Sequence, residues 1–299
     1  MMSKKWLVSA FLTCIVSFAF AQQQEKENNE SKYDDFFRQS FNVKAISSRA
    51  YNSLSVAVLS DESLVYVSDK PKLPIASSKG RFRPFVYDLA SNKSKRMSTK
   101  NLCEVGDMKY HIAGLTVDDS STFMIAALND ISQNDFIAVS RVSLVHIDIA
   151  YGFSQCATPP FVELGYTYTH PHYDSKSKYL YFSSDMPGGA GGLDIYRVKR
   201  TGNNQWGEIE SLEAINTANN DVYPFLDDEG ILYFSTLTGA HGFDVFAWEE
   251  DYDKPLRLPA PINSRVDDFN FIKVDEKNGV ICRSSADAES TIVYRMIAF

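Results

Sequence analysis

The stretch Asp174-Ser-Lys-Ser-Lys-Tyr-Leu-Tyr-Phe-Ser183 shows the pattern on which the fold prediction rests. A polar turn headed by Asp leads into a short apolar run that ends on a small residue. Four other stretches share this pattern: Asp61–Ser68, Asp118–Ala127, Asp227–Ser235 and Asp275–Ser284. Asp, Asn and Gly tolerate the backbone angles of tight hairpins, and runs that are apolar at successive positions suit strands buried on both faces. The pattern therefore predicts a chain built from strands.

The five copies recur at a regular interval. Their equivalent residues Val65, Met124, Leu180, Leu232 and Ile281 are 59, 56, 52 and 49 residues apart. This period lies near the 40 to 50 residues of a four-stranded propeller blade. A second apolar run follows each copy: Pro84–Tyr87, Val145–Ile149, Leu193–Val198, Phe243–Trp248 and Thr291–Tyr294. We predict an all-β fold, a β-propeller of five four-stranded blades.

The last repeat ends too soon to supply its own fourth strand. The segment 41–46, Phe-Asn-Val-Lys-Ala-Ile, is a strand-like stretch that belongs to no repeat. Because a closed ring must hide its sheet edges, we expect this N-terminal strand to complete the last blade. The predicted propeller domain therefore covers residues 41–299.

The residues before the domain look like an export signal. Lys4 and Lys5 precede an apolar run over 6–20, and Ala19-Phe20-Ala21 supplies small residues for cleavage before Gln22. We predict a signal peptide at 1–21, a flexible polar leader at 22–40 and a periplasmic location. No later stretch reaches the roughly 20 apolar residues of a membrane span.

Composition and cysteine content limit the partners and the covalent chemistry. The 299 residues carry a formal charge of -8, which disfavours a nucleic-acid binder because phosphate contacts need clustered Lys and Arg. Beyond the signal, three cysteines remain. Cys103 and Cys156 are a possible pair, whereas Cys282 sits in an apolar run and is expected to be buried as a small hydrophobe.

Repeats three and four carry the sharpest motifs. They read Thr169-His-Pro-His172, Tyr179–Asp185, Gly188-Gly-Ala-Gly-Gly192 with Leu193-Asp-Ile-Tyr196, and Ile215-Asn-Thr217, then Asp221-Val-Tyr-Pro224, Ile231–Ser235, Gly242–Phe246 and Ile262-Asn-Ser264. This part, about residues 165 to 272, resembles the TolB-like, WD-related propeller repeats of exported Bacteroidetes proteins. Repeats one and two lack the glycines and the leading Pro.

The resemblance implies a role as well as a fold. In that family, such propellers occur in periplasmic components of type IX secretion and gliding machinery. The resemblance therefore implies a non-enzymatic periplasmic interaction subunit of an outer-membrane secretion apparatus, bound to a secretion or translocon protein and capping or plugging its periplasmic mouth. The alternative is a free glycan- or peptide-binding propeller that uses its central cavity.

Candidate chemical sites each have a structural alternative. His170 and His172 could ligate a metal, but zinc usually needs at least three protein ligands. Gly188–Gly192 lacks the Lys-Ser/Thr of a phosphate loop, and the acidic turns 118–119, 227–229 and 267–268 lack a calcium-loop pattern. No catalytic motif is present. We predict no catalytic, metal or cofactor site, no small-molecule ligand and no enzyme activity.

Two features are candidates for a protein interface. The aromatic residues Tyr151, Phe153, Phe161, Tyr166, Tyr168 and Tyr173 could anchor a partner or pack between blades. The polar stretch Asn129–Asp135 is typical of a long loop, and long loops on a rigid scaffold are where partners usually bind.

Overall fold

The described part of the chain consists mainly of strands joined by turns and loops. The computed structural model describes residues 36–37, 39–60, 62–71, 82–97, 110–118, 123–130, 142–148, 155–239, 242–250 and 252–299. It divides into two compact units, one of Met1–Phe41 with Ala298–Phe299 and one of Asn42–Ile297. The predicted signal peptide and most of the predicted leader lie outside the described residues.

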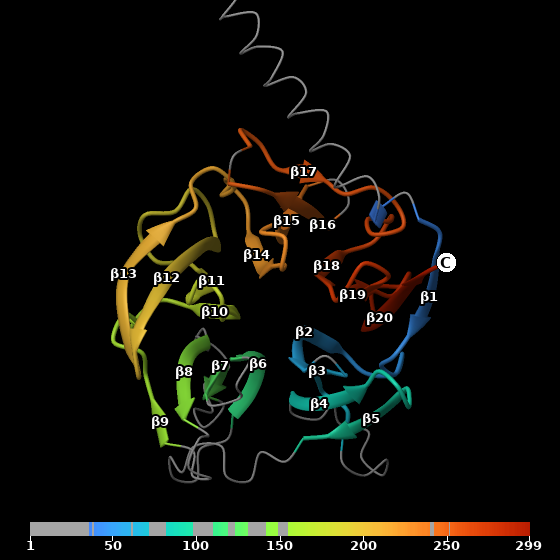
Figure 1. Ribbon diagram of the computed structural model, residues 1–299, viewed down its shortest axis with the longest axis horizontal. Helices are drawn as coiled ribbons and strands as arrows, with labels where there is room; N and C mark the ends of the chain where they lie inside the picture. The colour runs from blue at the N-terminus through green and yellow to red at the C-terminus, as the bar shows by residue number, and fades with distance from the viewer. Residues whose placement is uncertain are drawn as a thin grey trace, which may run out of the picture. The chain divides into compact units, whose positions relative to one another are not determined.

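Twenty strands make five four-stranded antiparallel sheets (Figure 1). The first sheet is β2 (Ser53–Ser60), β3 (Ser63–Ser68), β4 (Arg83–Asp88) and β5 (Lys93–Arg96), and the second is β6 (Tyr110–Val117), β7 (Phe123–Asp130), β8 (Val142–Asp148) and β9 (Gln155–Ala157). The third is β10 (Tyr168–Asp174), β11 (Tyr179–Ser184), β12 (Asp194–Gly202) and β13 (Gln205–Ser211). The fourth is β14 (Asp221–Leu226), β15 (Leu232–Thr238), β16 (Gly242–Trp248) and β17 (Leu256–Arg257).

The fifth sheet joins the two ends of the strand sequence. It contains β18 (Asp268–Lys273), β19 (Asn278–Ser284) and β20 (Thr291–Ala298), in the order β1-β20-β19-β18 with β1 (Phe41–Ala45) at its edge. The strand-like stretch at 41–46 is thus paired with the last strand of the chain. Just after β1, the Ile46 amide donates to the Val293 carbonyl at 2.9 Å, and Ser47 Oγ accepts from the Val293 amide at 2.9 Å.

The inner strands of the sheets contact one another in a closed circuit. Strand β2 contacts β6, β6 contacts β10, β10 contacts β14, β14 contacts β18 and β18 contacts β2. Figure 1 shows the sheets arranged around these strands. The prediction of an all-β, β-propeller fold is confirmed. Each residue used to measure the repeat lies in the second strand of its sheet, at Val65, Met124, Leu180, Leu232 and Ile281.

The Asp-headed turns form the hairpins between first and second strands. The Asp174 carboxylate accepts the Ser177 amide at 2.8 Å, Asp227 accepts the Ile231 amide at 2.9 Å, and Asp275 accepts the Asn278 amide at 2.8 Å. In these three turns the Asp therefore closes its own turn, which explains why Asp recurs at this place in the sequence.

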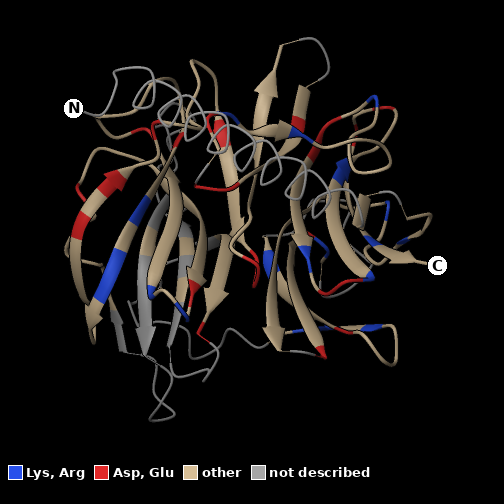
Figure 2. Cartoon of the chain, turned by 45° about the horizontal axis from the view of Figure 1, so that its top comes forward, with Lys and Arg blue, Asp and Glu red and all other residues tan. Residues whose placement is uncertain are grey.

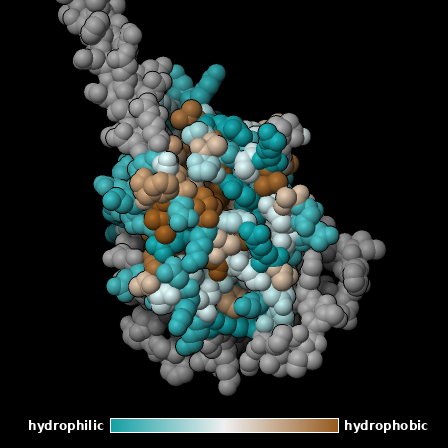
Figure 3. Space-filling model, turned by 90° about the vertical axis from the view of Figure 1, so that its right-hand side faces the viewer, coloured by the Kyte–Doolittle hydropathy of each residue, from teal (hydrophilic) through white to brown (hydrophobic). Residues whose placement is uncertain are grey.

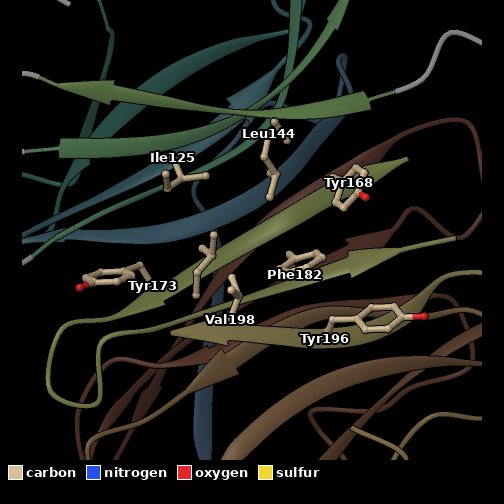
Figure 4. Close-up of a cluster of buried hydrophobic side chains, with 9 residues drawn as sticks. Ile125, Leu144, Tyr168, Tyr173, Phe182, Tyr196 and Val198 are labelled. Atoms are coloured by element: carbon tan, nitrogen blue, oxygen red, sulfur yellow. The ribbon is translucent and has the colours of Figure 1, made fainter. Parts of the chain in front are cut away.

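Hydrophobic side chains fill the spaces between neighbouring sheets. One cluster joins Ile125 and Leu144 of the second sheet to Leu180, Phe182 and residues of similar burial in the third (Figure 4). Aromatic rings stack along it, with the centroids of Phe182 and Tyr196 5.9 Å apart. Such contacts between facing sheets bury the strands on both faces, as the uninterrupted apolar runs predicted.

The charged residues lie mainly at strand ends, in loops and on outer strands (Figure 2). On the side of the molecule seen in Figure 3, hydrophobic residues occur in small groups between hydrophilic ones. Among the described residues, no helix has the length and apolar character needed to cross a membrane.

Candidate site in the axial cavity

A bulge interrupts every inner strand at the same place. The register with the second strand shifts between Leu54 and Val56 in β2 and between Ile112 and Gly114 in β6. It shifts in the same way in the other three inner strands, between Thr169 and His172, between Val222 and Phe225, and between Phe269 and Ile272. Bulges re-aim side chains and are frequent beside functional sites.

Four of the bulged residues have left-handed backbone angles. The φ values are 50° for Ser55, 50° for His170, 56° for Tyr223 and 51° for Asn270. A non-glycine residue in this region costs on the order of 1–3 kcal/mol. The protein thus holds one strained residue in each of four neighbouring inner strands, and all four strained residues line the same cavity.

The cavity lies where the inner strands meet. Its lining comes from β2, β10, β14 and β18, and its empty volume, which includes its open side, is about 280 Å³. The lining residues are Ser55, Val56, Ala57, His170, Pro171, His172, Tyr223, Pro224, Phe225, Asn270 and Ile272. None of these has a charged carboxylate, ammonium or guanidinium group, so the cavity is polar but neutral.

His170 lies against an aromatic ring. Its imidazole centroid is 3.7 Å from that of Tyr223, with the rings inclined by 35°. The ring is half-buried, but its Nδ1 atom is fully buried and has no hydrogen-bond partner. Loss of hydration lowers the pKa of His170 to about 3, so the imidazole is neutral at pH 7.

His172 lies between two other rings. Its centroid is 4.8 Å from that of Phe225 and 6.2 Å from that of Tyr181. Loss of hydration lowers its pKa to about 4, although the nearby Asp174 carboxylate and a hydrogen bond to the Leu226 backbone act in the opposite direction. Nε2 of His172 is buried and has no hydrogen-bond partner.

Asn270 ties the cavity to two neighbouring strands. Its Oδ1 atom accepts a hydrogen bond from the Val56 amide, and its own amide donates to Ser235 Oγ at 3.2 Å. Burial raises the pKa of Tyr223, and the adjacent Cys282 thiol raises it further. Cys282 is fully buried, which confirms its predicted role as a small hydrophobe.

Tight packing at the bulge explains a glycine in β6. A Cβ atom at Gly114 would lie 2.7 Å from Ser55 Oγ and 3.5 Å from Pro171 Cδ. A side chain at this position would therefore require the Ser55 hydroxyl to move.

The two histidines singled out in the sequence are therefore brought together, but without further metal ligands. Among the described residues, no group of three or more His, Cys, Asp or Glu side chains is placed to hold a metal ion. Sequence patterns did not reveal Ser55, Tyr223 and Asn270 as partners in this cavity. The signal that could have found them is their shared position, two residues into each inner strand.

The glycine-rich segment packs closely against its surroundings. Gly188 has a φ of 104°, as a tight turn requires. The Asp194 carboxylate accepts the amides of Ala190 and Gly191 at 3.1 Å each, and a Cβ atom at Gly189 would overlap this carboxylate. The glycines thus allow the loop to wrap around Asp194.

The acidic turn 227–229 is neutralised within the protein. Lys273 Nζ lies 2.9 Å from Glu229 and 3.8 Å from Asp227, and Lys176 pairs with Asp228. Asp268 likewise pairs with Arg283. Lysine and arginine side chains therefore pair with these carboxylates. Of the remaining acidic turn, 118–119, only residue 118 is described.

The aromatic candidates that are described pack inside the protein. Tyr168 is fully buried and Tyr173 is 7% exposed, and Phe161 and Tyr166 pack against the same cluster. The interblade alternative is therefore correct for these four. Tyr151, Phe153, most of the stretch Asn129–Asp135 and the Cys103–Cys156 pair lie outside the described residues or side chains.

The recurring Ile-Asn-Thr/Ser motif connects neighbouring sheets. Asn263 Oδ1 accepts the Val245 amide at 2.7 Å, and its Nδ2 donates to the carbonyls of Val245 and Leu258 at 2.8 Å each. The next residue, Ser264, donates through its amide and hydroxyl to Asp268 at the start of β18. Asn216 and Thr217 repeat this arrangement one blade earlier.

Comparison with known proteins supports the fold. No family model matches the chain, and no curated protein sequence is similar to it. Among solved structures, it is similar to a glycoside hydrolase (TM-score 0.54, 8% identity, 89% of this chain and 94% of the other). It is also similar to a family 117 glycoside hydrolase of Zobellia galactanivorans (TM-score 0.52, 9% identity, 88% and 91%).

TolB from Acinetobacter baumannii is a further match, with a TM-score of 0.45 and 14% identity over 85% of this chain. The chain spans 56% of the length of TolB. Structural neighbours thus include a TolB protein. At these identities, the likeness concerns the fold alone.

The comparisons correct one prediction. The sequence analysis predicted no enzyme activity, but glycoside hydrolases share this fold over nearly their whole length. The exclusion of enzyme activity is therefore wrong, because a propeller can host catalytic as well as binding sites.

Proposed function

We propose that this chain is a periplasmic protein-interaction propeller, a subunit of an outer-membrane protein secretion apparatus of the type IX kind. It would bind a secretion or translocon protein and cap or plug its periplasmic mouth. The export-type sequence at 1–21 and the repeat resemblance over about 165 to 272 support this proposal. Both come from the sequence.

The size of the axial cavity is the observation that favours this function over the alternative. The empty space of about 280 Å³ at the cavity includes open solvent, so the enclosed part is far smaller than the roughly 300–1,000 Å³ of pockets that enclose drug-sized ligands. A glycan chain or a peptide is larger than such ligands. A macromolecular partner would therefore bind to the outer loops of the ring.

The loops at one end of the third sheet are the surface we assign to the partner. Tyr168 pairs with Ser184, and Ser184 pairs with Asp194, so the loops 158–167 and 185–193 leave the sheet at the same end. The Thr167 amide donates to Asp185 Oδ1 at 2.6 Å, which joins the two loops. Leu164 on the first loop is fully exposed, and 187–192 are exposed on the second.

Co-purification tests the proposal. The affinity-tagged full chain would be expressed in its own host and recovered from detergent-solubilised envelopes, and its partners would be identified by mass spectrometry. We expect a stoichiometric outer-membrane secretion protein. A parallel purification of a tagged, unrelated exported protein is the control. Recovery of the chain alone would contradict the proposal and favour a free ligand-binding propeller.

A further inference from the structure

Two outer strands of the propeller carry opposite charges. Strand β5 contains Lys93, Lys95 and Arg96 among its four residues, and both lysines are exposed. Strand β13 contains Glu208 and Glu210, both exposed, and has no Lys or Arg. Each strand lies at the outer end of its sheet, in the orders β2-β3-β4-β5 and β10-β11-β12-β13. Figure 1 shows the two strands on different sides of the ring of sheets.

The cations of β5 have no ion-pair partner within the described part of the chain. This holds for Lys93, Lys95 and Arg96 alike. The residue opposite Lys93 on β4 is Asp88, whose carboxylate accepts the Ser91 amide. Cations on an edge strand oppose its pairing with another basic edge, whereas an acidic edge is a favourable neighbour.

The acidic edge keeps its negative charge despite two cations on the strand beside it. Arg197 of β12 pairs with Glu210 at 2.8 Å and with Glu250 at 3.2 Å, so these three groups together carry one negative charge. Lys199 of β12 lies against the Tyr179 ring. Glu208 makes no ion pair with a described residue and adds a second negative charge on β13 itself.

Both strands also present backbone groups on their outer side. The Met97 amide donates to the Pro84 carbonyl at 2.9 Å, and the Leu212 amide donates to the Ile195 carbonyl at 3.1 Å. Hydrogen-bonded pairs alternate along an antiparallel ladder, so every second residue of an edge strand directs its amide and carbonyl outward. These residues are Ser94 and Arg96 in β5, and Ile209 and Ser211 in β13.

The two edges match in face and in direction. Residues directly opposite one another in a ladder share a face, so Lys95 lies on the face of Val65, which packs against the second sheet. Glu210 lies on the face of Tyr181, which packs against the fourth sheet. In both cases this is the face turned toward the next sheet along the chain. A half-turn about an axis perpendicular to the sheet therefore brings β13 antiparallel to β5 with these faces on the same side.

We infer that a second copy of this chain binds along β5 through its own β13, so that the two sheets join in one antiparallel ladder. Lys93 and Lys95 of one copy then lie beside Glu208 and Glu210 of the other. Contact of β5 with β5, or of β13 with β13, would bring like charges together, which destabilises cross-strand pairs. Because each copy has one edge of each kind, the contact is head-to-tail and can repeat. It does not use the loops 158–167 and 185–193, so it goes beyond the proposed function.

Sedimentation measures this contact in the unaltered chain. The purified full chain would be centrifuged over a range of protein concentrations at about 0.01 M and about 1 M salt, between which the screening length falls from about 30 Å to about 3 Å. We expect the weight-average mass to rise with concentration at low salt, with a dissociation constant at least tenfold larger at high salt. The mass of a single copy at every concentration, or association that is independent of salt, would overturn the inference.

Charge reversal locates the contact. A variant with Lys93→Glu and Lys95→Glu has two acidic edges, and a variant with Glu208→Lys and Glu210→Lys has two basic edges. We expect each variant alone to remain a single copy, and an equimolar mixture of the two to associate, because every contact then joins an acidic edge to a basic one. The control is Lys178→Glu with Lys277→Glu, which makes the same change of net charge at exposed hairpin positions and should associate like the unaltered chain.

Association of either variant alone, loss of association in the control, or a mixture of two folded variants that does not associate would overturn the inference. Zero-length crosslinking by a carbodiimide tests the unaltered chain if a variant does not fold. In a mixture of ¹⁴N- and ¹⁵N-labelled chains, we expect crosslinked peptides that join Lys93 or Lys95 of one isotope to Glu208 or Glu210 of the other. The absence of mixed-isotope crosslinks at these residues would also overturn it.

Discussion

Replacement of Asn263 by Ala tests the link between the fourth and fifth sheets. The Asn263 side chain is 4% exposed and makes three hydrogen bonds, one from the Val245 amide and two to backbone carbonyls. The Val245 carbonyl keeps a second partner, because the Leu258 amide also donates to it at 3.0 Å. Two backbone groups, the Val245 amide and the Leu258 carbonyl, would lose the partner that Asn263 provides.

The expected loss follows from these two groups. At about 1–3 kcal/mol for each buried group left without a partner, Asn263→Ala should lower the free energy of unfolding by about 4 kcal/mol. For a chain of this size, that corresponds to a fall in Tm of roughly 10 °C. Such a change is large against the roughly 5–15 kcal/mol of a typical domain.

Chemical unfolding followed by tryptophan fluorescence measures the change. Trp248 is buried in the same sheet as Val245 and reports on it directly. Asn219→Ala is the matched control, because Asn219 is exposed and is joined to its neighbours by its backbone. It should change stability by less than about 0.5 kcal/mol. A loss below about 1 kcal/mol for Asn263→Ala would refute the reasoning.

Three further predictions concern stability. Gly189→Ala should destabilise the protein by more than about 1 kcal/mol, because the new Cβ overlaps the Asp194 carboxylate. Thermal unfolding would measure the loss as a lower Tm. An unchanged Tm would contradict the close approach of Gly189 to Asp194. Arg283→Met leaves the buried Asp268 carboxylate without its ion-pair partner and should lower the free energy of unfolding, measured in urea, by about 3–5 kcal/mol. An unchanged free energy of unfolding would show that the ion pair is dispensable. The folded-state pKa of His172 lies below its unfolded value, so the unfolded chain binds the proton first and stability should fall as pH drops from about 6.5 to about 4. His170 acts in the same direction, so His172→Gln should reduce this fall, measured as stability against pH, rather than remove it, and an unchanged slope would show that His172 does not contribute.

The sequence predicted the strand pattern well, because that pattern depends on local chemistry. The Asp-headed turns close on their own backbone, and the apolar runs after them need burial on both faces, so each signal is contained in about ten residues. Glycine spacing at 188–192 also identified a tight loop. These features required no knowledge of which strands become neighbours.

The axial cavity was not predictable in the same way. Its wall combines residues from four repeats that are far apart in the chain, such as Ser55 and Asn270, and the bulges that aim them inward break the simple alternation of a strand. The role of Asn263 was hidden for a related reason. Its motif recurs visibly, but the backbone groups that it binds lie 18 and 5 residues away.

Site-specific photocrosslinking tests the proposed function most directly. A photoreactive amino acid would replace Leu164 on the proposed partner surface or Lys178 in the hairpin at the opposite end of the third sheet, both of which are exposed. After irradiation of intact cells of the native host, we predict a covalent adduct between the Leu164 variant and an outer-membrane secretion protein, and none from the Lys178 variant. No membrane-protein adduct from Leu164, while the variant is present and folded, would contradict the account.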